Sequence, residues 1–445
     1  MSEELLSVGL DVGTTSTQLI VSRLLVENRA SSFAVPEMEI SQREILYKSP
    51  VYFTPLLDEY HMDGPGIRKL VEEEYRKAGI DRKQVDTGAV IITGETSRKE
   101  NAHTVLEALT GLAGDFVVAA AGPDLESVLA AKGAGAVELS ERTGKTVLHM
   151  DIGGGTSNLA LIRDGEILRT GCLNVGGRLV KQTESGCVTY VSPVLAGISR
   201  MKVGDTPTVE ELRDLARLLT QALEMAAGLR EAEGLLEVLS TREAERSWTP
   251  PQEPVVLSFS GGVADCIGKD YPPLAFGDIG PVLGRYIRES LMCRGEYALG
   301  EETIRATVIG AGCHSAQLSG STVFHQNITF PLKNLAVKNI AGPEEMVPGE
   351  EPVVYGMRGI PEPSYREIVE LAQTIARRLE GPVLICLEQD MAKALGQALS
   401  LRLPKDTPIL CIDRVKASEG SYLDIGSPVS HAFPVVVKTL VLGGK

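Results

Sequence analysis

Short apolar runs alternate with glycine-rich turns through the first two thirds of the chain. Near the start, residues 5–10 are largely apolar, residues 17–23 contain an apolar run at 19–21, and the two flank the segment 11–16. This pattern predicts two strands joined by a tight turn. A similar arrangement returns at 146–150 and 158–163. The chain therefore predicts a strand–turn–strand unit that occurs twice.

Other runs predict the elements around these two units. Apolar or extended patterns predict strands at 44–53, 89–93, 116–121, 166–170 and 255–259. Helical spacing of apolar residues predicts helices at 65–78 and 124–131, and a long helix that begins at Thr208, with Glu211 completing a capping box. The apolar stripe of that long helix extends to Leu229.

The last hundred residues predict a separate small unit. Residues 342–351 are rich in Pro, Gly and Glu, which is typical of a linker or surface loop. Beyond them, Ser364 and Glu367 predict a capped helix start. Strands at 383–387 and 408–413 with a helix between them complete the α/β pattern.

Length, charge and cysteine content narrow the protein class. A chain of 445 residues predicts about three domains. A net charge of −15 argues against binding to nucleic acid or to an anionic membrane surface. No apolar run approaches the roughly 18 residues of a membrane helix. The seven cysteines are scattered and never form a Cys-x-x-Cys pair, which favours a reducing, cytoplasmic location over a disulfide or zinc framework.

The two predicted turns carry the same chemistry. Asp11-Val-Gly-Thr-Thr-Ser16 and Asp151-Ile-Gly-Gly-Gly-Thr156 share an aspartate, an aliphatic residue, glycine and closing hydroxyls. Glycine lets backbone N–H groups approach an anion, and N–H and hydroxyl groups bind phosphate oxygens. An aspartate would repel phosphate, so its natural role is to hold Mg²⁺ or the water bound to it. One such turn is common, but two in matched contexts predict a clamp on a polyphosphate.

Two further glycine segments extend this pattern. Gly261 and Gly262 follow the strand at 255–259 and open a helix, and such a pair lets the backbone approach a base or sugar. The segment 306–312 contains Gly310 and Gly312 and leads into another short helix.

The order of these segments resembles the superfamily of actin, heat-shock chaperones and sugar kinases, in which two duplicated domains close on ATP. The resemblance implies an α/β fold with duplicated actin-like, ribonuclease-H-like ATPase domains at 1–145 and 146–340. It also implies an additional small C-terminal α/β unit at 341–445.

The same resemblance implies the residues of a site for ATP and Mg²⁺. Asp11 and Asp151 are expected to be metal-binding and catalytic, and Glu126, with Asp124 behind it, is the candidate for activating the attacking water. The residues expected to contact the nucleotide are Gly13, Thr14 and Thr15 in the first loop, Gly153, Gly154, Gly155 and Thr156 in the second, Gly261 and Gly262 at the adenosine, and Gly310 and Gly312 in a connecting segment.

Within this superfamily the chain resembles the EutA family of reactivating factors for adenosylcobalamin-dependent ethanolamine ammonia-lyase. The segments that carry the resemblance are 93–102, 122–127, 314–322, 419–426 and 434–440. It implies an ATP-dependent, chaperone-like factor whose client is the lyase and which promotes exchange of damaged cobalamin for adenosylcobalamin. Association with a bacterial microcompartment and formation of a homo-oligomer stay open.

The residues by themselves leave two other functions open. One is a small-molecule kinase on the same fold, which needs a catalytic aspartate in a substrate cleft. The other is a filament or scaffold protein that uses ATP as a switch. The C-terminal unit is expected either to dock the client or to buttress the first domain. His149 is interpreted as structural, and Trp248 has no assigned role.

Overall fold

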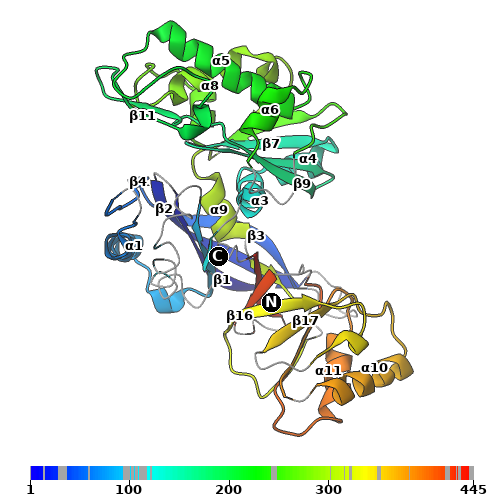
Figure 1. Cartoon of the computed structure of the whole chain (residues 1–445). Helices are drawn as coiled ribbons and strands as arrows, with labels where there is room; N and C mark the ends of the chain where they lie inside the picture. Colours follow the sequence, from blue (N-terminus) through cyan, green and yellow to red (C-terminus); the bar gives the residue numbers. More distant parts are fainter. Residues whose placement is uncertain are drawn as a thin grey trace.

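The chain forms three α/β units, each built on its own sheet (Figure 1). The computed structural model describes residues 2–13, 16–28, 38–58, 61–93, 101, 105, 109, 118–120, 123–241, 248–300, 302–314, 316–319, 323–347, 352–379, 381–415, 421–426, 428 and 432–439. The first unit lies between the second unit, which contains the predicted second turn, and the third, C-terminal unit.

The first sheet has the strand order β3-β2-β1-β5-β6, with the short β4 pairing with β2. Its strands are β1 (Ser2–Val12), β2 (Ser16–Asn28), β3 (Met38–Lys48), β4 (Tyr52–Phe53), β5 (Thr87–Ile92) and β6 (Val118–Ala120). The strands β3, β2 and β1 form an antiparallel meander, and β5 and β6 continue the sheet in parallel with β1. Helix α1 (Gly64–Ala78) begins at the Asp63 cap and ends at Gly79, whose φ of 71° is left-handed.

The second sheet repeats this topology with the order β9-β8-β7-β12-β13. Its strands are β7 (Val147–Ile152), β8 (Ser157–Arg163), β9 (Glu166–Leu173), β12 (Val256–Ser260) and β13 (Tyr297–Leu299). Here β9, β8 and β7 form the meander, and β12 and β13 run parallel to β7. The predicted α/β fold with a duplicated domain is therefore confirmed.

Helices and a short ribbon complete the second unit. They are β10 (Val180–Gln182), β11 (Val188–Val191), α5 (Val209–Ala226), α6 (Gly234–Leu239), α7 (Gly262–Gly268) and α8 (Gly280–Glu289). The capping box of Thr208 and Glu211 starts α5 as predicted. The predicted stripe is too long, because α5 ends at Ala226 and Leu229 is 42% exposed.

Trp248, which the sequence left without a role, is a core residue of the second unit. Its indole Nε1 donates a hydrogen bond of 2.9 Å to the carbonyl of Ala226. A Cβ on Gly171 would lie 2.5 Å from the indole ring, so this glycine leaves the space that the ring fills. The tryptophan thereby fixes the connector before β12 to the end of α5 and to β9.

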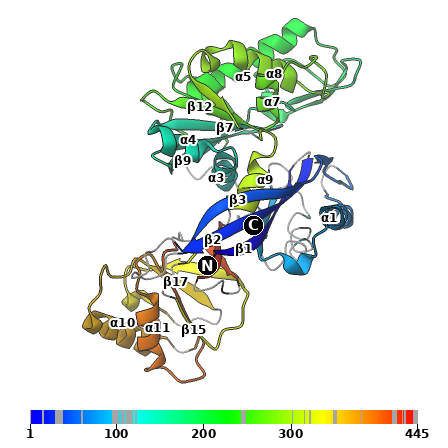
Figure 2. The ribbon, with the colours of Figure 1, turned by 180° about the vertical axis from the view of Figure 1, so that it is seen from behind.

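Two crossing helices join the first and second units (Figure 2). They are α3 (Pro123–Gly133) and α9 (Ala306–His314); α4 (Ala136–Thr143) follows α3 after Gly135, whose φ is 74°. A Cβ on Gly133 would lie 1.8 Å from the Ala306 carbonyl oxygen, and one on Gly310 would lie 2.0 Å from the Leu129 carbonyl oxygen. The two helices therefore touch backbone to backbone, which only glycine permits.

The third sheet has the order β14-β21-β20-β16-β17-β18-β19-β15. Its strands are β14 (Ala316–Leu318), β15 (Phe324–Gln326), β16 (Leu332–Asn339), β17 (Val353–Met357), β18 (Val383–Leu387), β19 (Ile409–Ile412), β20 (Ser421–Ile425) and β21 (Pro434–Thr439). Helices α10 (Tyr365–Arg378) and α11 (Ala392–Ser400) accompany the parallel strands β16 to β19.

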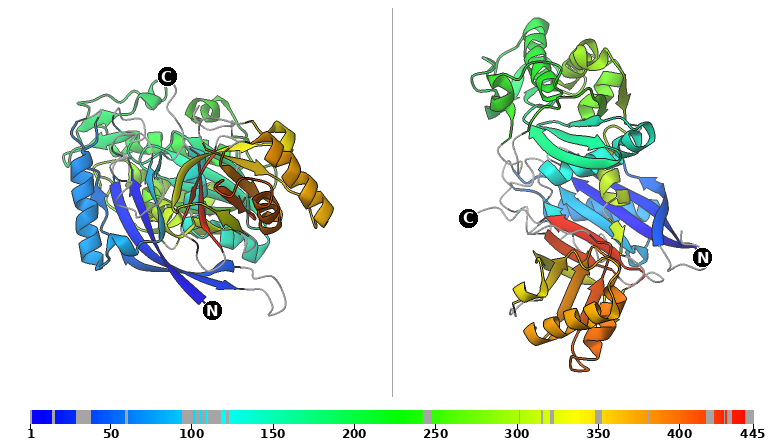
Figure 3. Two further views of the ribbon diagram at one scale, coloured as in Figure 1. Left: turned by 90° about the horizontal axis from the view of Figure 1, so that it is seen from below. Right: turned by 90° about the vertical axis from the view of Figure 1, so that its right-hand side faces the viewer.

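The third unit begins earlier than the sequence predicts. Strands β14, β15 and β16 precede residue 341, yet they belong to the third sheet, and β16 pairs with β17 across the loop at 342–351. That loop connects two neighbouring parallel strands and does not separate two units. Leu318 of β14 packs against Leu5, Leu24 and Ile40 of the first sheet. Figure 3 shows the third unit adjoining the first and lying far from the second.

Replacing Gly310 with alanine should destabilise the folded chain. The added methyl group would meet the Leu129 carbonyl at 2.0 Å and force the two crossing helices apart. Such overpacking costs about 1–3 kcal/mol of unfolding free energy. Denaturant unfolding measures it, with Gly234→Ala as the control, because a Cβ there meets no atom within 4 Å. Equal stability of the two variants would contradict the backbone contact.

Candidate nucleotide site

The same backbone hydrogen bond closes both of the repeated hairpins. The N–H of Gly13 donates to the Ser16 carbonyl at 2.9 Å, and the N–H of Gly153 donates to the Thr156 carbonyl at 2.9 Å. Asp11 pairs with Gln18 across its hairpin, and Asp151 pairs with Asn158. Each turn thus places an aspartate near the carboxyl end of a central strand. Thr14 and Thr15, predicted to contact phosphate, lie outside the described residues.

Each aspartate accepts a hydrogen bond from a hydroxyl at the end of the next parallel strand. Thr93, after β5, donates to Asp11 Oδ1 at 2.9 Å, and Ser260, ending β12, donates to Asp151 Oδ1 at 2.5 Å. Thr307 of α9 approaches the second oxygen of Asp151 at 3.5 Å. Sequence reasoning missed these three partners. For Thr93 and Ser260 the available signal was a hydroxyl residue at the carboxyl end of a strand that neighbours the aspartate's strand, whereas Thr307 lies on a helix and had no such signal.

Burial shifts the pKa of both aspartates upward. It raises the pKa of Asp11 from 3.8 to about 7, against the effect of the Thr93 hydrogen bond, and the negative charge of Asp151 contributes to the rise. Burial raises the pKa of Asp151 to about 6, against the hydrogen bonds from Ser260 and Thr307. The two carboxylates are therefore close enough to repel each other, and a cation between them would relieve the repulsion.

The donor set suits Mg²⁺ that is shared with a ligand. Within the described residues, no group of three or more His, Cys, Asp or Glu side chains is arranged to hold a metal ion. Two carboxylates remain, and Mg²⁺ in nucleotide sites typically takes one or two carboxylates and completes its shell with water and phosphate oxygens. Asp11 and Asp151 thus fit a metal that arrives with a polyphosphate.

A backbone loop supports the second hairpin from behind. The N–H groups of Gly177 and Arg178 donate to the carbonyls of Gly153 and Gly154 at 3.0 and 2.7 Å. The Arg178 side chain packs over Gly154, and its Nε donates to buried Asp278 at 3.1 Å. Gly155 has open space around its α-carbon. The tip is therefore held firmly on one side and left accessible on the other.

The predicted adenosine pair lies beside the second hairpin. Gly261 has a φ of 88°, and a Cβ there would lie 2.3 Å from the carbonyl oxygen of Ile152, the last residue of β7. Its N–H donates to the Thr303 carbonyl at 2.8 Å. Gly262 opens α7 and has no atom within 4 Å of where its Cβ would be. Their contact with adenosine stays a prediction.

Gly310, Gly312 and Glu126 lie on the crossing helices. Gly310 and Gly312 allow α9 to approach α3 and β1; a Cβ on Gly312 would lie 3.0 Å from the Gly9 nitrogen. Glu126 is half-buried in the first turn of α3. This turn is anchored on β9, because Ser127 donates to the Gly171 carbonyl at 3.2 Å. A nucleotide contact for the two glycines and a catalytic role for Glu126 both stay predictions.

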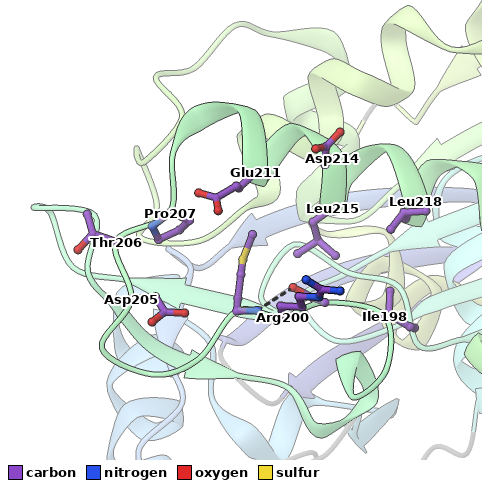
Figure 4. A pocket seen from close by; sticks show the side chains of 11 residues that line it. Ile198, Arg200, Asp205, Thr206, Pro207, Glu211, Asp214, Leu215 and Leu218 are labelled. Atoms are coloured by element: carbon purple, nitrogen blue, oxygen red, sulfur yellow. Dashed lines mark hydrogen bonds between the residues drawn. The ribbon is translucent and has the colours of Figure 1, made fainter.

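A separate pocket of about 480 Å³ lies in the second unit between the turn at 198–201 and the start of α5 (Figure 4). Ile198, Leu215 and Leu218 contribute apolar surface, and Asp205 and Asp214 contribute carboxylates. Neither Asp11 nor Asp151 lines this pocket, so it is distinct from the candidate nucleotide site.

Comparison with known proteins identifies the family. The model of the family "Ethanolamine utilisation protein EutA" matches residues 3–348 and 345–443. The chain is 37% identical over 463 residues to ethanolamine ammonia-lyase reactivase EutA of Salmonella typhimurium, and 36% identical over 471 residues to the protein of that name from Escherichia coli; each comparison covers 99% of both chains. The chain belongs to the EutA family. The resemblance inferred from the motifs is thereby confirmed.

Solved structures similar to this EutA-family chain are more distant. A Ppx/GppA family member from Aquifex aeolicus is 14% identical, with a TM-score of 0.43, over 69% of this chain and 97% of that one. EutJ from Carboxydothermus hydrogenoformans is 17% identical, with a TM-score of 0.35, over 69% and 88%. Among the described residues, no helix is both long and apolar enough to span a membrane.

Asp11→Asn should change how the stability of the nucleotide-free protein depends on pH. The folded pKa of Asp11, about 7, exceeds its ordinary value of 3.8. The folded state therefore binds more protons than the unfolded state in this interval, and this group lowers stability as the pH rises through it. An uncharged asparagine removes that loss, so the melting temperature of the variant relative to wild type should rise between about pH 4 and about pH 7 and level off above that range.

Melting curves across this pH range check the expectation. Asp214→Asn is the matched control, since this side chain is 57% exposed, and it should follow the wild-type profile. A constant difference between Asp11→Asn and wild type at every pH would show that Asp11 is not buried as described.

Proposed function

We propose that the chain binds Mg²⁺–ATP between its first two units and reactivates adenosylcobalamin-dependent ethanolamine ammonia-lyase. Family membership and two relatives named as reactivases of ethanolamine ammonia-lyase support the proposal that this lyase is the client. The observation that carries the nucleotide part is the pair of buried aspartates on matched hairpin tips, whose charges repel each other.

Asp11 and Asp151 would hold Mg²⁺, directly or through water, opposite the phosphates of the nucleotide. When bound, the metal neutralises phosphate charge and favours hydrolysis. The residues of the chain provide the rest. Thr93 and Ser260 orient the two carboxylates. The N–H groups of Gly13 and Gly153 close the two turns, so the N–H groups of Gly154 and Gly155 would donate to phosphate oxygens. Glu126 is our candidate for orienting the attacking water.

The crossing helices would convert nucleotide state into movement of the first two units. Thr307 of α9 approaches Asp151, while the same helix packs through Gly310 on α3 and through Gly312 on β1. A change in what Asp151 binds would therefore alter its contact with Thr307, and through that contact the position of α9, which joins the two units. If ATP and ADP favour different angles between the units, that difference biases binding of the client.

The third unit is our candidate for docking the lyase. It adjoins the first unit and lies far from the second, and its sheet contains neither of the paired hairpins, so it is not needed to build the phosphate clamp. The opened lyase would release damaged cobalamin and accept adenosylcobalamin. We also propose that the protein is located in the cytoplasm. Whether it forms a homo-oligomer and whether it associates with a microcompartment are open to measurement. A kinase of the same fold and an ATP-switched filament are the alternatives.

Asp11→Asn and Asp151→Asn should each lower ATP hydrolysis about 100-fold or more. Each substitution keeps the shape of the side chain and removes the charge opposite the metal. Steady-state phosphate release with Mg²⁺ and no added small-molecule acceptor measures the loss, and Asp214→Asn serves as the control. Wild-type turnover in both aspartate variants would refute the site.

Wild-type protein should restore activity to cobalamin-inactivated lyase only when ATP, Mg²⁺ and adenosylcobalamin are all present, and both aspartate variants should fail. Leaving out one component at a time tests each requirement. Turnover that appears only with a small-molecule acceptor would favour the kinase, and ATP-dependent light scattering would favour the filament. Reactivation without ATP would separate the client part of the proposal from the nucleotide part.

A further inference from the structure

A chain of buried polar side chains runs behind Asp151. In the parallel pairing of β7 and β12, His149 lies opposite Ser258, and Asp151 lies opposite Ser260. His149 Nδ1 is 3.0 Å from Ser258 Oγ, and its Nε2 is 2.9 Å from Ser260 Oγ. Ser260 Oγ in turn is 2.5 Å from Asp151 Oδ1. His149, Ser258 and Ser260 are each at most 2% exposed, so water does not compete for these contacts.

The proton positions along this chain follow from the last acceptor. An ionised Asp151 can only accept, so Ser260 donates its single hydroxyl proton to Oδ1. The Ser260 oxygen then accepts from His149 Nε2–H. His149 Nδ1 carries no proton and accepts from the Ser258 hydroxyl. The ring is fully buried and both of its nitrogens face serine hydroxyls, which suits a neutral ring with a single N–H.

The first hairpin has no histidine in the corresponding position. The residue two positions before Asp11 is Gly9, where Asp151 has His149. A Cβ on Gly9 would lie 2.5 Å from the carbonyl oxygen of Val308, so this position admits α9 instead of a side chain. Asp11 is held by the Thr93 hydroxyl, whereas Asp151 is held through two serines and a ring. The duplicated sites therefore differ in how firmly their carboxylates are oriented.

We propose that His149 is a positioning residue of the nucleotide site: as the Nε2–H tautomer it directs the Ser260 hydroxyl onto Asp151 and fixes the carboxylate that receives Mg²⁺. The proposal rests on the proposed Mg²⁺–nucleotide site. It assigns His149 no contact with nucleotide or metal. If the ring merely fills the core, an apolar replacement of similar size would serve equally well.

Nitrogen NMR of the full chain labelled with ¹⁵N-histidine tests the tautomer. The chain has six histidines, and the signals lost in His149→Gln identify the ring in question. We expect a protonated Nε2 and an unprotonated Nδ1 in the nucleotide-free protein at neutral pH. A protonated Nδ1 would reverse the hydrogen bonds to both serines and overturn the proposal. This measurement stands whether or not the protein hydrolyses ATP.

The Mg²⁺ requirement of hydrolysis tests the function. His149→Leu removes both ring nitrogens, and loss of a residue that orients a metal ligand typically weakens metal affinity about 10–100-fold. We expect the half-saturating Mg²⁺ concentration to rise by about that factor, with metal-free ADP binding changed less than about threefold. His149→Gln keeps an amide donor and should recover most of the loss.

Two further variants separate positioning from lost stability. Leu219 is a buried residue of α5 in the hydrophobic core of the second unit. Leu219→Ala leaves a cavity there and should lower the melting temperature without changing the Mg²⁺ requirement. Ser258→Ala leaves Asp151 and Ser260 intact and should raise the Mg²⁺ requirement even if His149→Leu does not fold. Unchanged Mg²⁺ dependence in Ser258→Ala and in any folded His149 variant would overturn the proposal. A wild-type protein that binds no Mg²⁺–nucleotide would instead refute the proposed site, and the NMR result would still decide the tautomer.

Discussion

The architecture of the first two units centres on two carboxylates buried close to each other. Burial disfavours the charged form of each and raises the pKa of both, and the charge of Asp151 raises that of Asp11 further. Such an arrangement is costly unless a cation enters. Hydroxyls at the ends of neighbouring strands reduce the cost and orient the oxygens. Gly155, in the second hairpin, leaves room on the open side for a ligand that brings the charge.

Duplication gives the two carboxylates matching positions, and local sequence makes them different. Both sheets have the same strand order, and both hairpins close with the same hydrogen bond. In the first, Gly9 makes room for α9; in the second, His149 supports the aspartate through Ser260. The first hairpin thus contacts the joining helix α9, and the second hairpin carries the more firmly oriented carboxylate. Thr307 connects the two, because it belongs to α9 and approaches Asp151.

The joining helices α3 and α9 are held together by close backbone contact, and the third unit contacts the first through the short strand β14. Gly133 and Gly310 let α3 and α9 meet without side chains between them, so the contact has little freedom to absorb added volume. Leu318 of β14 packs the third sheet against the first. The third unit therefore extends the first.

The sequence by itself determined the repeated hairpins, the capped helices at Thr208 and Ser364, and the family. Each depends on local patterns, such as apolar spacing, turn glycines and capping side chains, that are visible over a few neighbouring residues. Only the tertiary structure decided the partners of the aspartates, the place of Trp248 and the membership of β14 to β16 in the third sheet. The hydroxyl partners of the aspartates lie 82, 109 and 156 positions away along the chain, the carbonyl partner of Trp248 lies 22 positions away, and the place of β14 to β16 depends on which strands pair. The composition of the loop at 342–351 suggested a unit boundary, because residues such as Pro and Gly indicate where regular structure stops. Which unit a strand belongs to depends instead on its pairing, and β16 pairs with β17 across this loop.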